Sequence, residues 1–143
     1  MTEPRERAVQ ELYEADQVPG WTPPEDLMGR ALRLTNGVME HRDELDEAIA
    51  AVADRWRVDR MPVIDRAVLR LALYELRHCP DVPTAVVLNE AVRIAKAFST
   101  AQSGRFVNGV LGSLARTERP SQPSPRASEP DATGADGESP DSG

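Results

Sequence analysis

The most strongly patterned part of this 143-residue chain is the run IDRAVLRLALYEL, residues 64–76. Its apolar residues recur every three to four positions, as on a helix with one buried face: Ile64, Val68, Leu71, Ala72 and Leu76. The segment that follows, Pro80-Asp81-Val82-Pro83, cannot continue a helix because proline lacks the backbone N–H. The pattern predicts a helix over about 63–78.

The helical period continues on both sides of this run. It predicts further helices over about 4–16, 25–54, 84–98 and 101–116. The stretch 25–54 is either one long bent helix or two stacked helices, because Asn36-Gly37 interrupts it, and Thr22 is expected to cap its start. No run of useful length alternates apolar and polar residues, so the predicted fold class is all-α.

The end of the chain has a different composition. From Pro120 to Gly143 it contains no Leu, Ile, Val, Phe, Trp or Tyr and is rich in Pro, Ser, Gly and Asp. Such a segment buries too little apolar surface to offset the entropy lost on ordering. We expect a folded helical domain over 1–118 and a disordered acidic tail over 119–143.

Charge is distributed unevenly along the chain, whose net charge is −7. Residues 1–54 carry 5 Arg and 13 Asp and Glu, whereas residues 55–119 carry 11 Lys and Arg and 6 Asp and Glu. A basic patch is the usual mark of phosphate binding. The basic middle of this acidic chain therefore permits RNA binding without demonstrating it.

The sequence contains little that would support catalysis. Neither glycine-rich phosphate-binding loop, G-x-x-x-x-G-K-[ST] or G-x-G-x-x-G, occurs in it. The two histidines, His41 and His78, do not have the spacing of zinc ligands. His78 and Cys79 are adjacent, but neighbours on a helix point about 100° apart and do not face each other. We therefore expect a chain that is not an enzyme and has no cofactor and no metal site.

The expected location is the cytoplasm. The longest uncharged apolar runs last only a few residues, too short to cross a membrane. The first residues, MTEPR, have no apolar stretch behind a basic start, so we expect no signal peptide.

Three stretches, taken in order, resemble the NusB family. They are RERAVQELYEAD at 5–16, the run at 64–76 with DVP at 81–83 and NEAVRIAKAF at 89–98, and SGRFVNGVL at 103–111. The resemblance covers about 1–115. It implies an all-α fold of two small helical bundles packed across each other.

The resemblance also implies a function in transcription antitermination. Proteins of this family bind the boxA element of nascent RNA jointly with NusE, a protein of the small ribosomal subunit. The pair joins other Nus factors on RNA polymerase, which then transcribes ribosomal RNA operons through terminators. Some family members form homodimers that cover the RNA surface.

The family's RNA-binding face maps onto the first helix and the start of the last one. The residues carried over by the resemblance are Arg5, Arg7, Arg70, Ser103, Arg105, Phe106 and Asn108. Phe106 either stacks on a base or belongs to the core, and Asn108 either contacts RNA or bonds the backbone locally. Asp65 is placed near the NusE contact, or is a surface acid stabilised by the helix dipole. We expect Arg5, Arg7, Arg70 and Arg105 to share one patch beside Phe106.

Two departures from the family pattern concern RNA affinity. Only four residues precede Arg5, where the family has several more basic residues, and Gln102 stands where many relatives have an acid.

Two other hypotheses stay open. One is a fragment related to ribosomal RNA cytosine methyltransferases, which would need a cofactor loop and a catalytic cysteine absent after residue 118. The other is a purely structural helical dimerisation module.

Overall fold

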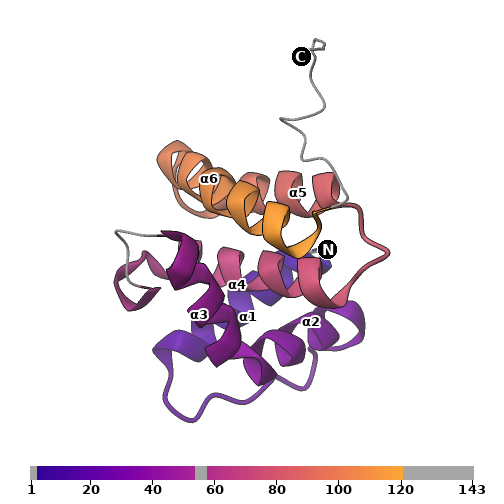
Figure 1. Ribbon diagram of the computed structural model, residues 1–143. Helices are drawn as coiled ribbons and strands as arrows, with labels where there is room; N and C mark the ends of the chain where they lie inside the picture. The colour runs from indigo at the N-terminus through magenta and orange to yellow at the C-terminus, as the bar shows by residue number, and fades with distance from the viewer. Residues whose placement is uncertain (1–2, 54–57, 121–143) are drawn as a thin grey trace, which may run out of the picture.

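The computed structural model describes residues 3–53 and 58–120, and within these ranges it contains helices and no strand (Figure 1). The elements in chain order are α1 (Pro4–Gln17), α2 (Gly29–Glu40), α3 (Arg42–Ala53), η1 (Val58–Arg60), α4 (Val63–His78), α5 (Thr84–Phe98) and α6 (Ala101–Glu118). The predicted all-α class is confirmed. No helix in the described part of the chain is long and apolar enough to cross a membrane.

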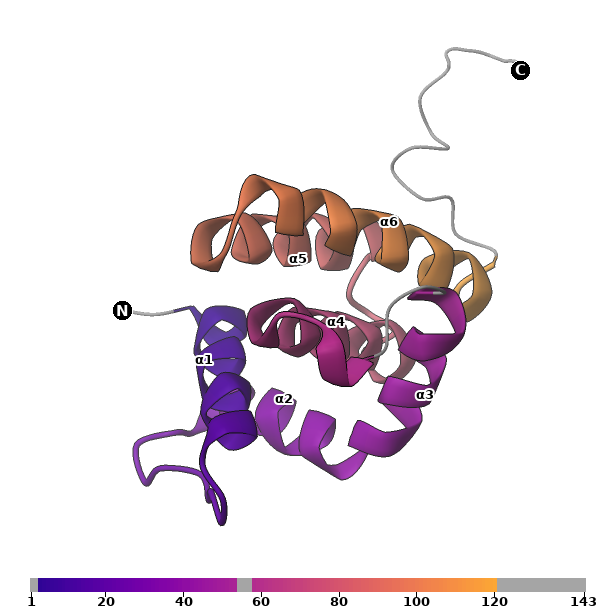
Figure 2. The same ribbon diagram turned by 90° about the vertical axis from the view of Figure 1, so that its left-hand side faces the viewer.

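Helix α4 lies at the centre of the molecule. Helices α1, α2 and α3 pack on one side of it, and the hairpin of α5 and α6 packs on the other (Figures 1 and 2). The three-helix groups α1–α3 and α4–α6 share one continuous apolar core. This arrangement agrees with the two bundles implied by the family resemblance.

Burial of α4 on several faces explains its central position. The sequence pattern assigned one apolar face to this helix, but Leu69 and Leu73, outside that face, are also fully buried. A helix that is apolar around most of its circumference is expected in an interior position. Ile64, at the start of the expected face, is only partly buried.

The stretch 25–54 forms two helices, and the division is not at the predicted place. Gly37 lies inside α2, where a Cβ atom would overlap the Tyr74 ring of α4. The glycine therefore permits close helix packing instead of breaking the helix. The break comes at His41, whose backbone N–H donates to the carbonyl oxygens of Gly37 and Val38 at 3.2 Å.

The expected cap at Thr22 is wrong. Helix α2 begins only at Gly29, and Met28 occupies its N-cap without a side-chain hydrogen bond. Thr22 is exposed in the connection between α1 and α2. The local pattern of Thr22 followed by prolines resembled a cap, but Leu27 turns inward and is buried as part of this connection instead.

Arg119, which the sequence analysis assigned to the tail, is buried against the end of α4. Its guanidinium donates to the carbonyl oxygens of Glu75, Leu76, Cys79 and Val82 and to the Thr84 hydroxyl. Carbonyl groups in the last turn of a helix can lack a partner within the helix, and Arg119 supplies a donor to that of Leu76. The carbonyl oxygens of Glu75 and Cys79 already accept from the backbone N–H groups of Cys79 and Val82, and Arg119 gives each a second donor. The packed unit therefore extends at least to Arg119. The disorder predicted for the tail concerns residues 121–143, which lie outside the described residues.

Candidate nucleic-acid interface

A pocket of about 340 Å³ lies where the start of α4 meets the turn between α5 and α6. We call it the corner pocket. Its lining residues are Pro62, Asp65, Ser99, Thr100, Gln102, Ser103 and Phe106. The α5–α6 turn lies on the same side of the molecule as the N-terminal end of α1 (Figure 2). The pocket therefore occupies the region to which the family resemblance assigned RNA binding.

Short-range hydrogen bonds hold the start of α6 in place. Thr100 is the N-cap, and its side chain accepts from the Ser103 backbone N–H at 3.0 Å. The Ser103 hydroxyl lies 3.0 Å from the Ser99 hydroxyl and 3.3 Å from that of Thr100. Ser103 is therefore a buried residue in the wall of the pocket, and its predicted contact with RNA stays a prediction.

Asp65 projects from the first turn of α4 and is only 3% exposed. Ser103 donates a hydrogen bond to its carboxyl group, but burial has the larger effect and raises the pKa of Asp65. Its Oδ1 atom has no hydrogen-bond donor within the described part of the chain. The alternative of a surface acid is therefore wrong, and the carboxyl group is a buried acceptor with unused capacity.

Phe106 and Arg105 are neighbours on the second turn of α6 but face different surroundings. Phe106 is half-buried, packs against the core and lines the corner pocket. The two alternatives left open for Phe106 are thus compatible, since one edge of the ring contributes to the core while another borders the pocket. Arg105 is exposed, and Asn108 is half-buried one turn further along.

Arg5 does not belong to an exposed patch. Its Nε and Nη2 atoms donate to the two carboxylate oxygens of Glu75 at 2.9 and 2.8 Å. Arg5 is 9% exposed and Glu75 is 1% exposed. Arg30 adds a second cation at 3.2 Å from Glu75. The guanidinium of Arg5 therefore joins α1 to α4 and is not available to a phosphate group.

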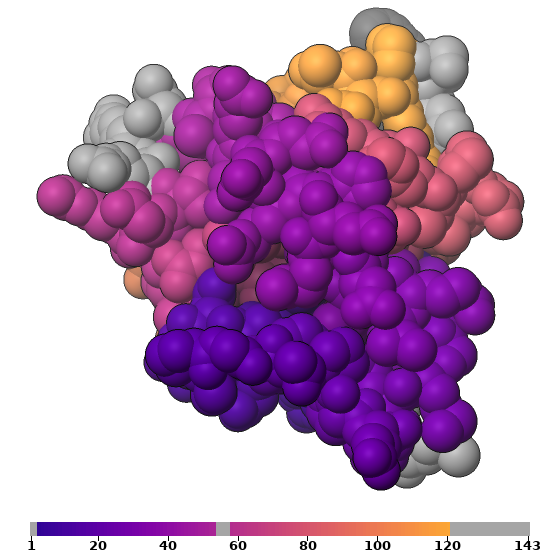
Figure 3. Space-filling model, turned by 90° about the horizontal axis from the view of Figure 1, so that it is seen from below, coloured from indigo at the N-terminus to yellow at the C-terminus, as the bar shows by residue number. Residues whose placement is uncertain are grey.

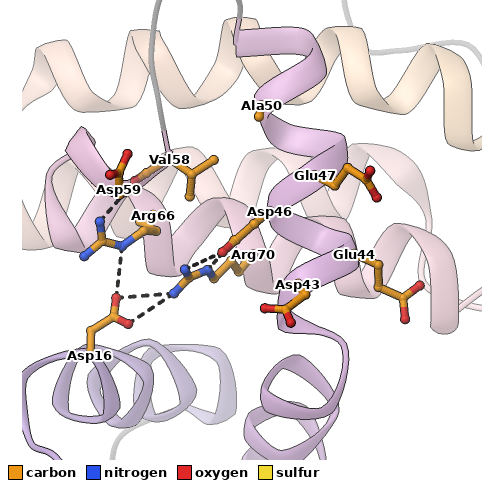
Figure 4. A pocket seen from close by; sticks show the side chains of 10 residues that line it. All are labelled: Asp16, Asp43, Glu44, Asp46, Glu47, Ala50, Val58, Asp59, Arg66 and Arg70. Carbon is orange, nitrogen blue, oxygen red and sulfur yellow. Dashed lines mark hydrogen bonds and ion pairs between the residues drawn. The ribbon is translucent and has the colours of Figure 1, made fainter.

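Arg70 is likewise buried and paired with carboxylates of the same chain. Its Nε and Nη2 atoms donate to both carboxylate oxygens of Asp46 at 2.6 and 2.8 Å, and Nη1 lies 3.3 Å from both oxygens of Asp16 (Figure 4). It is 7% exposed. The expectation that four arginines share one patch beside Phe106 is thus wrong for Arg5 and Arg70. The sequence alone could not show that these two arginines are unavailable to RNA, because the carboxylates that bind them lie 24 to 70 positions away along the chain.

The surroundings of Arg70 would also repel a phosphate chain. It lines an open hollow of about 1010 Å³ between α1, α3 and α4 (Figure 4). The acidic residues that line this hollow are Asp16, Asp43, Glu44, Asp46, Glu47 and Asp59, against Arg66 and Arg70. Viewed from below, the surface is formed chiefly by α1, α2 and α3, the acidic part of the chain (Figure 3).

Arg7 remains partly exposed on the first turns of α1. It donates to Glu11 at 3.0 Å and to the exposed Asp26 at 3.1 Å. These interactions raise the pKa of Arg7 and lower that of Asp26, in both cases chiefly through the hydrogen bond they share. An exposed pair of this kind is weak and can exchange partners. Of the predicted arginines, Arg7 and Arg105 are therefore the ones that a ligand can reach.

Sequence reasoning missed Lys96 near the α6 start. The aliphatic part of this exposed side chain crosses Gly104, where a Cβ atom would lie 2.6 Å from Lys96 Cγ. Gly104, a residue without a side chain in the first turn of α6, was the sequence feature that could have indicated the close approach of another side chain. It also missed Arg93, which pairs with Glu3, Glu6 and Glu90 and so neutralises acids beside the α1 start.

A model of the NusB family matches residues 2–116. The chain belongs to the NusB family. Transcription antitermination protein NusB of Symbiobacterium thermophilum is 48% identical over 112 residues, covering 76% of this chain and 73% of that protein. The corresponding protein of Acidothermus cellulolyticus is 42% identical over 140 residues, covering 90% of this chain and 96% of that protein.

Solved NusB structures share the fold. T. maritima NusB superposes with a TM-score of 0.71 at 31% identity, covering 81% of this chain and 93% of that one. NusB is a family of non-enzymatic antitermination factors, which confirms the expectation that this chain is not an enzyme. The fold implied by the resemblance is confirmed as well.

Proposed function

We propose that this NusB-family chain is an antitermination factor of ribosomal RNA operons that binds boxA RNA together with NusE. The relatives at 39–48% identity, all named transcription antitermination proteins, support this function. A structural neighbour, antitermination factors NusB and NusE in complex with dsRNA, has a TM-score of 0.69 at 24% identity and supports the fold. The observation that carries the site is the corner pocket, with half-buried Phe106 in its wall and exposed Arg105 beside it.

RNA binding through this site uses few cations. Arg7 and Arg105 contact phosphate groups, Phe106 stacks on a base, and Asn108 bonds the strand. Two phosphate contacts on a single strand give a slope of log affinity against log salt of only about −1.4. The chain alone therefore binds RNA weakly, and NusE supplies the remaining affinity.

The other partners extend the same proposal. Asp65 lies near the surface that NusE contacts, although its carboxyl group is recessed and only an inserted group reaches it. The RNA-bound pair then joins other Nus factors on RNA polymerase in the cytoplasm. A homodimer, known for some family members, stays a prediction that sedimentation at micromolar concentration would test.

A gel-shift titration with boxA RNA tests the function. We expect weak retardation by the chain alone and a much tighter complex when equimolar NusE is added. An RNA of the same length with a scrambled boxA is the control for sequence specificity. Equal binding of both RNAs in the presence of NusE would show that the chain is not a boxA factor.

A further inference from the structure

The corner pocket contains one polar atom whose bonding is incomplete. Asp65 Oδ1 has no hydrogen-bond donor among the residues described, although the side chain is 97% withdrawn from solvent. Leaving a buried acceptor unsatisfied costs about 1–3 kcal/mol, and more for a charged group. Such a group in a folded protein calls for an explanation, and a ligand that supplies the missing donor is one.

The rest of the lining restricts the kind of ligand. Phe106 and Pro62 present apolar ring surfaces, while Ser99 and Thr100 keep their hydroxyl groups engaged in the α6 cap. At about 340 Å³ the pocket is at the lower end of the range of small-molecule sites, about 300–1,000 Å³. A flat ring with hydrogen-bond donors on its edge matches these features. Unstacked bases of single-stranded RNA are recognised in this way, by aromatic stacking and contacts to their edges.

We propose that the corner pocket receives one unstacked nucleobase and that Asp65 accepts a hydrogen bond from a donor on the edge of that base, guanine being preferred. The proposal rests on the proposed function of RNA binding. Guanine carries an imino and an amino donor side by side, and a carboxylate only accepts. Uracil places a carbonyl oxygen on each side of its single imino donor, and these oxygens are repelled by the carboxylate.

Entry of the base requires a small opening of the pocket, because Asp65 is covered in the free chain. Gln102 lines the pocket from the first turn of α6 and is itself exposed, so its side chain can move without loss of core packing. Arg105 is exposed on the next turn of α6, and we assign to it the phosphate group of the bound nucleotide. An inserted side chain of a protein partner is the competing occupant.

The test uses four 11-nucleotide RNAs, oligouridine with U, A, C or G at the central position. Their affinities are measured by fluorescence anisotropy at 50 mM salt for the wild type, Asp65→Asn and the control Glu47→Gln, an exposed acid on α3. Base-edge recognition is worth about 1–3 kcal/mol, so we expect the wild type and the control to bind the G-containing RNA about tenfold tighter than oligouridine. Asp65→Asn should lose this preference while still binding oligouridine.

The outcomes separate the inference from the proposed function. Equal binding of all four RNAs by the wild type, or a preference for G that survives in Asp65→Asn, overturns the base pocket but leaves RNA binding intact. Loss of NusE binding by Asp65→Asn without a change in base preference assigns the pocket to the protein partner and also overturns it. Absence of binding to any RNA, with or without NusE, contradicts the proposed function itself. Circular dichroism and thermal unfolding establish that the variants are folded.

Discussion

Arg5 and Glu75 form a two-pronged, buried ion pair that joins α1 to α4, with N–O distances of 2.9 and 2.8 Å. A pair of this kind is costly to break on one side, because the remaining charge is left buried without a partner. Arg30 also lies 3.2 Å from Glu75, but its side chain is 37% exposed, so the buried charge left by removal of the acid is that of Arg5. The interaction explains why a residue at the expected RNA face is structural.

Glu75→Ala is therefore expected to destabilise the protein by about 3–5 kcal/mol in urea unfolding. The control is Glu47→Ala on the exposed face of α3, for which we expect a change below about 0.5 kcal/mol. Arg5→Gln should likewise reduce the free energy of unfolding by more than it reduces the free energy of RNA binding. A Glu75→Ala protein with wild-type stability would show that this pair does not hold the helices together.

Gly37 and Gly109 form a matched pair of helix glycines with opposite expectations. Gly37→Ala places a Cβ atom into the Tyr74 ring and should cost about 1–3 kcal/mol, as overpacked cores do. Gly109→Ala meets nothing within 4 Å and should stabilise α6 by up to about 1 kcal/mol. Thermal unfolding of both variants measures the difference. Equal effects of the two substitutions would contradict the packing described for α2 against α4.

Arg119 should contribute strongly to stability although it follows the last helix. Arg119→Ala removes the donors from the carbonyl groups at the end of α4, and we expect a loss of about 2–4 kcal/mol. Arg116→Ala, an exposed arginine that donates only to Ser113 among the described side chains, should be nearly neutral. A chain ending at 120 should retain wild-type stability. If a chain ending at 118 were equally stable, Arg119 would have no structural role.

Asp65 should make stability depend on pH in a defined direction. Because burial raises the pKa of Asp65 in the folded chain, folding favours its protonated form. Its stabilising contribution is complete below the ordinary pKa of aspartate and is lost as the pH rises through the raised value. Asp65→Asn should therefore be more stable than the wild type at pH 7, with a difference that shrinks as the pH falls toward 4. Chemical unfolding at several pH values measures this difference, and a constant difference would contradict the shift.

The sequence predicted the positions of helices well, but it did not predict the roles of individual charged side chains. The helices at 63–78 and 84–98 were predicted because their apolar period is strong and proline bounds both. The roles of Arg5 and Arg70 were not predictable, because arginine at a helix surface has the same pattern whether its partner is a phosphate group or a distant carboxylate. Only the fold brings Glu75 to Arg5 and Asp46 to Arg70.

The candidate site shows the same limit. The motif SGRFVNGVL located the start of α6, and with it Ser103, Arg105 and Phe106. The pocket that these residues form with Asp65 depends on the contact between α4 and α6, which are 23 positions apart along the chain at their nearest ends. The sequence therefore indicated the region of the candidate interface but not which of its side chains remain accessible.

The affinity of boxA RNA for the complex of this chain with NusE tests the central claim most directly. Base stacking on an aromatic side chain is worth about 1–3 kcal/mol, so Phe106→Ala should weaken binding about tenfold. Arg105→Gln should also weaken it and flatten the salt dependence, whereas Arg116→Gln, near the other end of α6, should leave it unchanged. Wild-type affinity in both Phe106→Ala and Arg105→Gln would contradict the assignment of RNA binding to the start of α6.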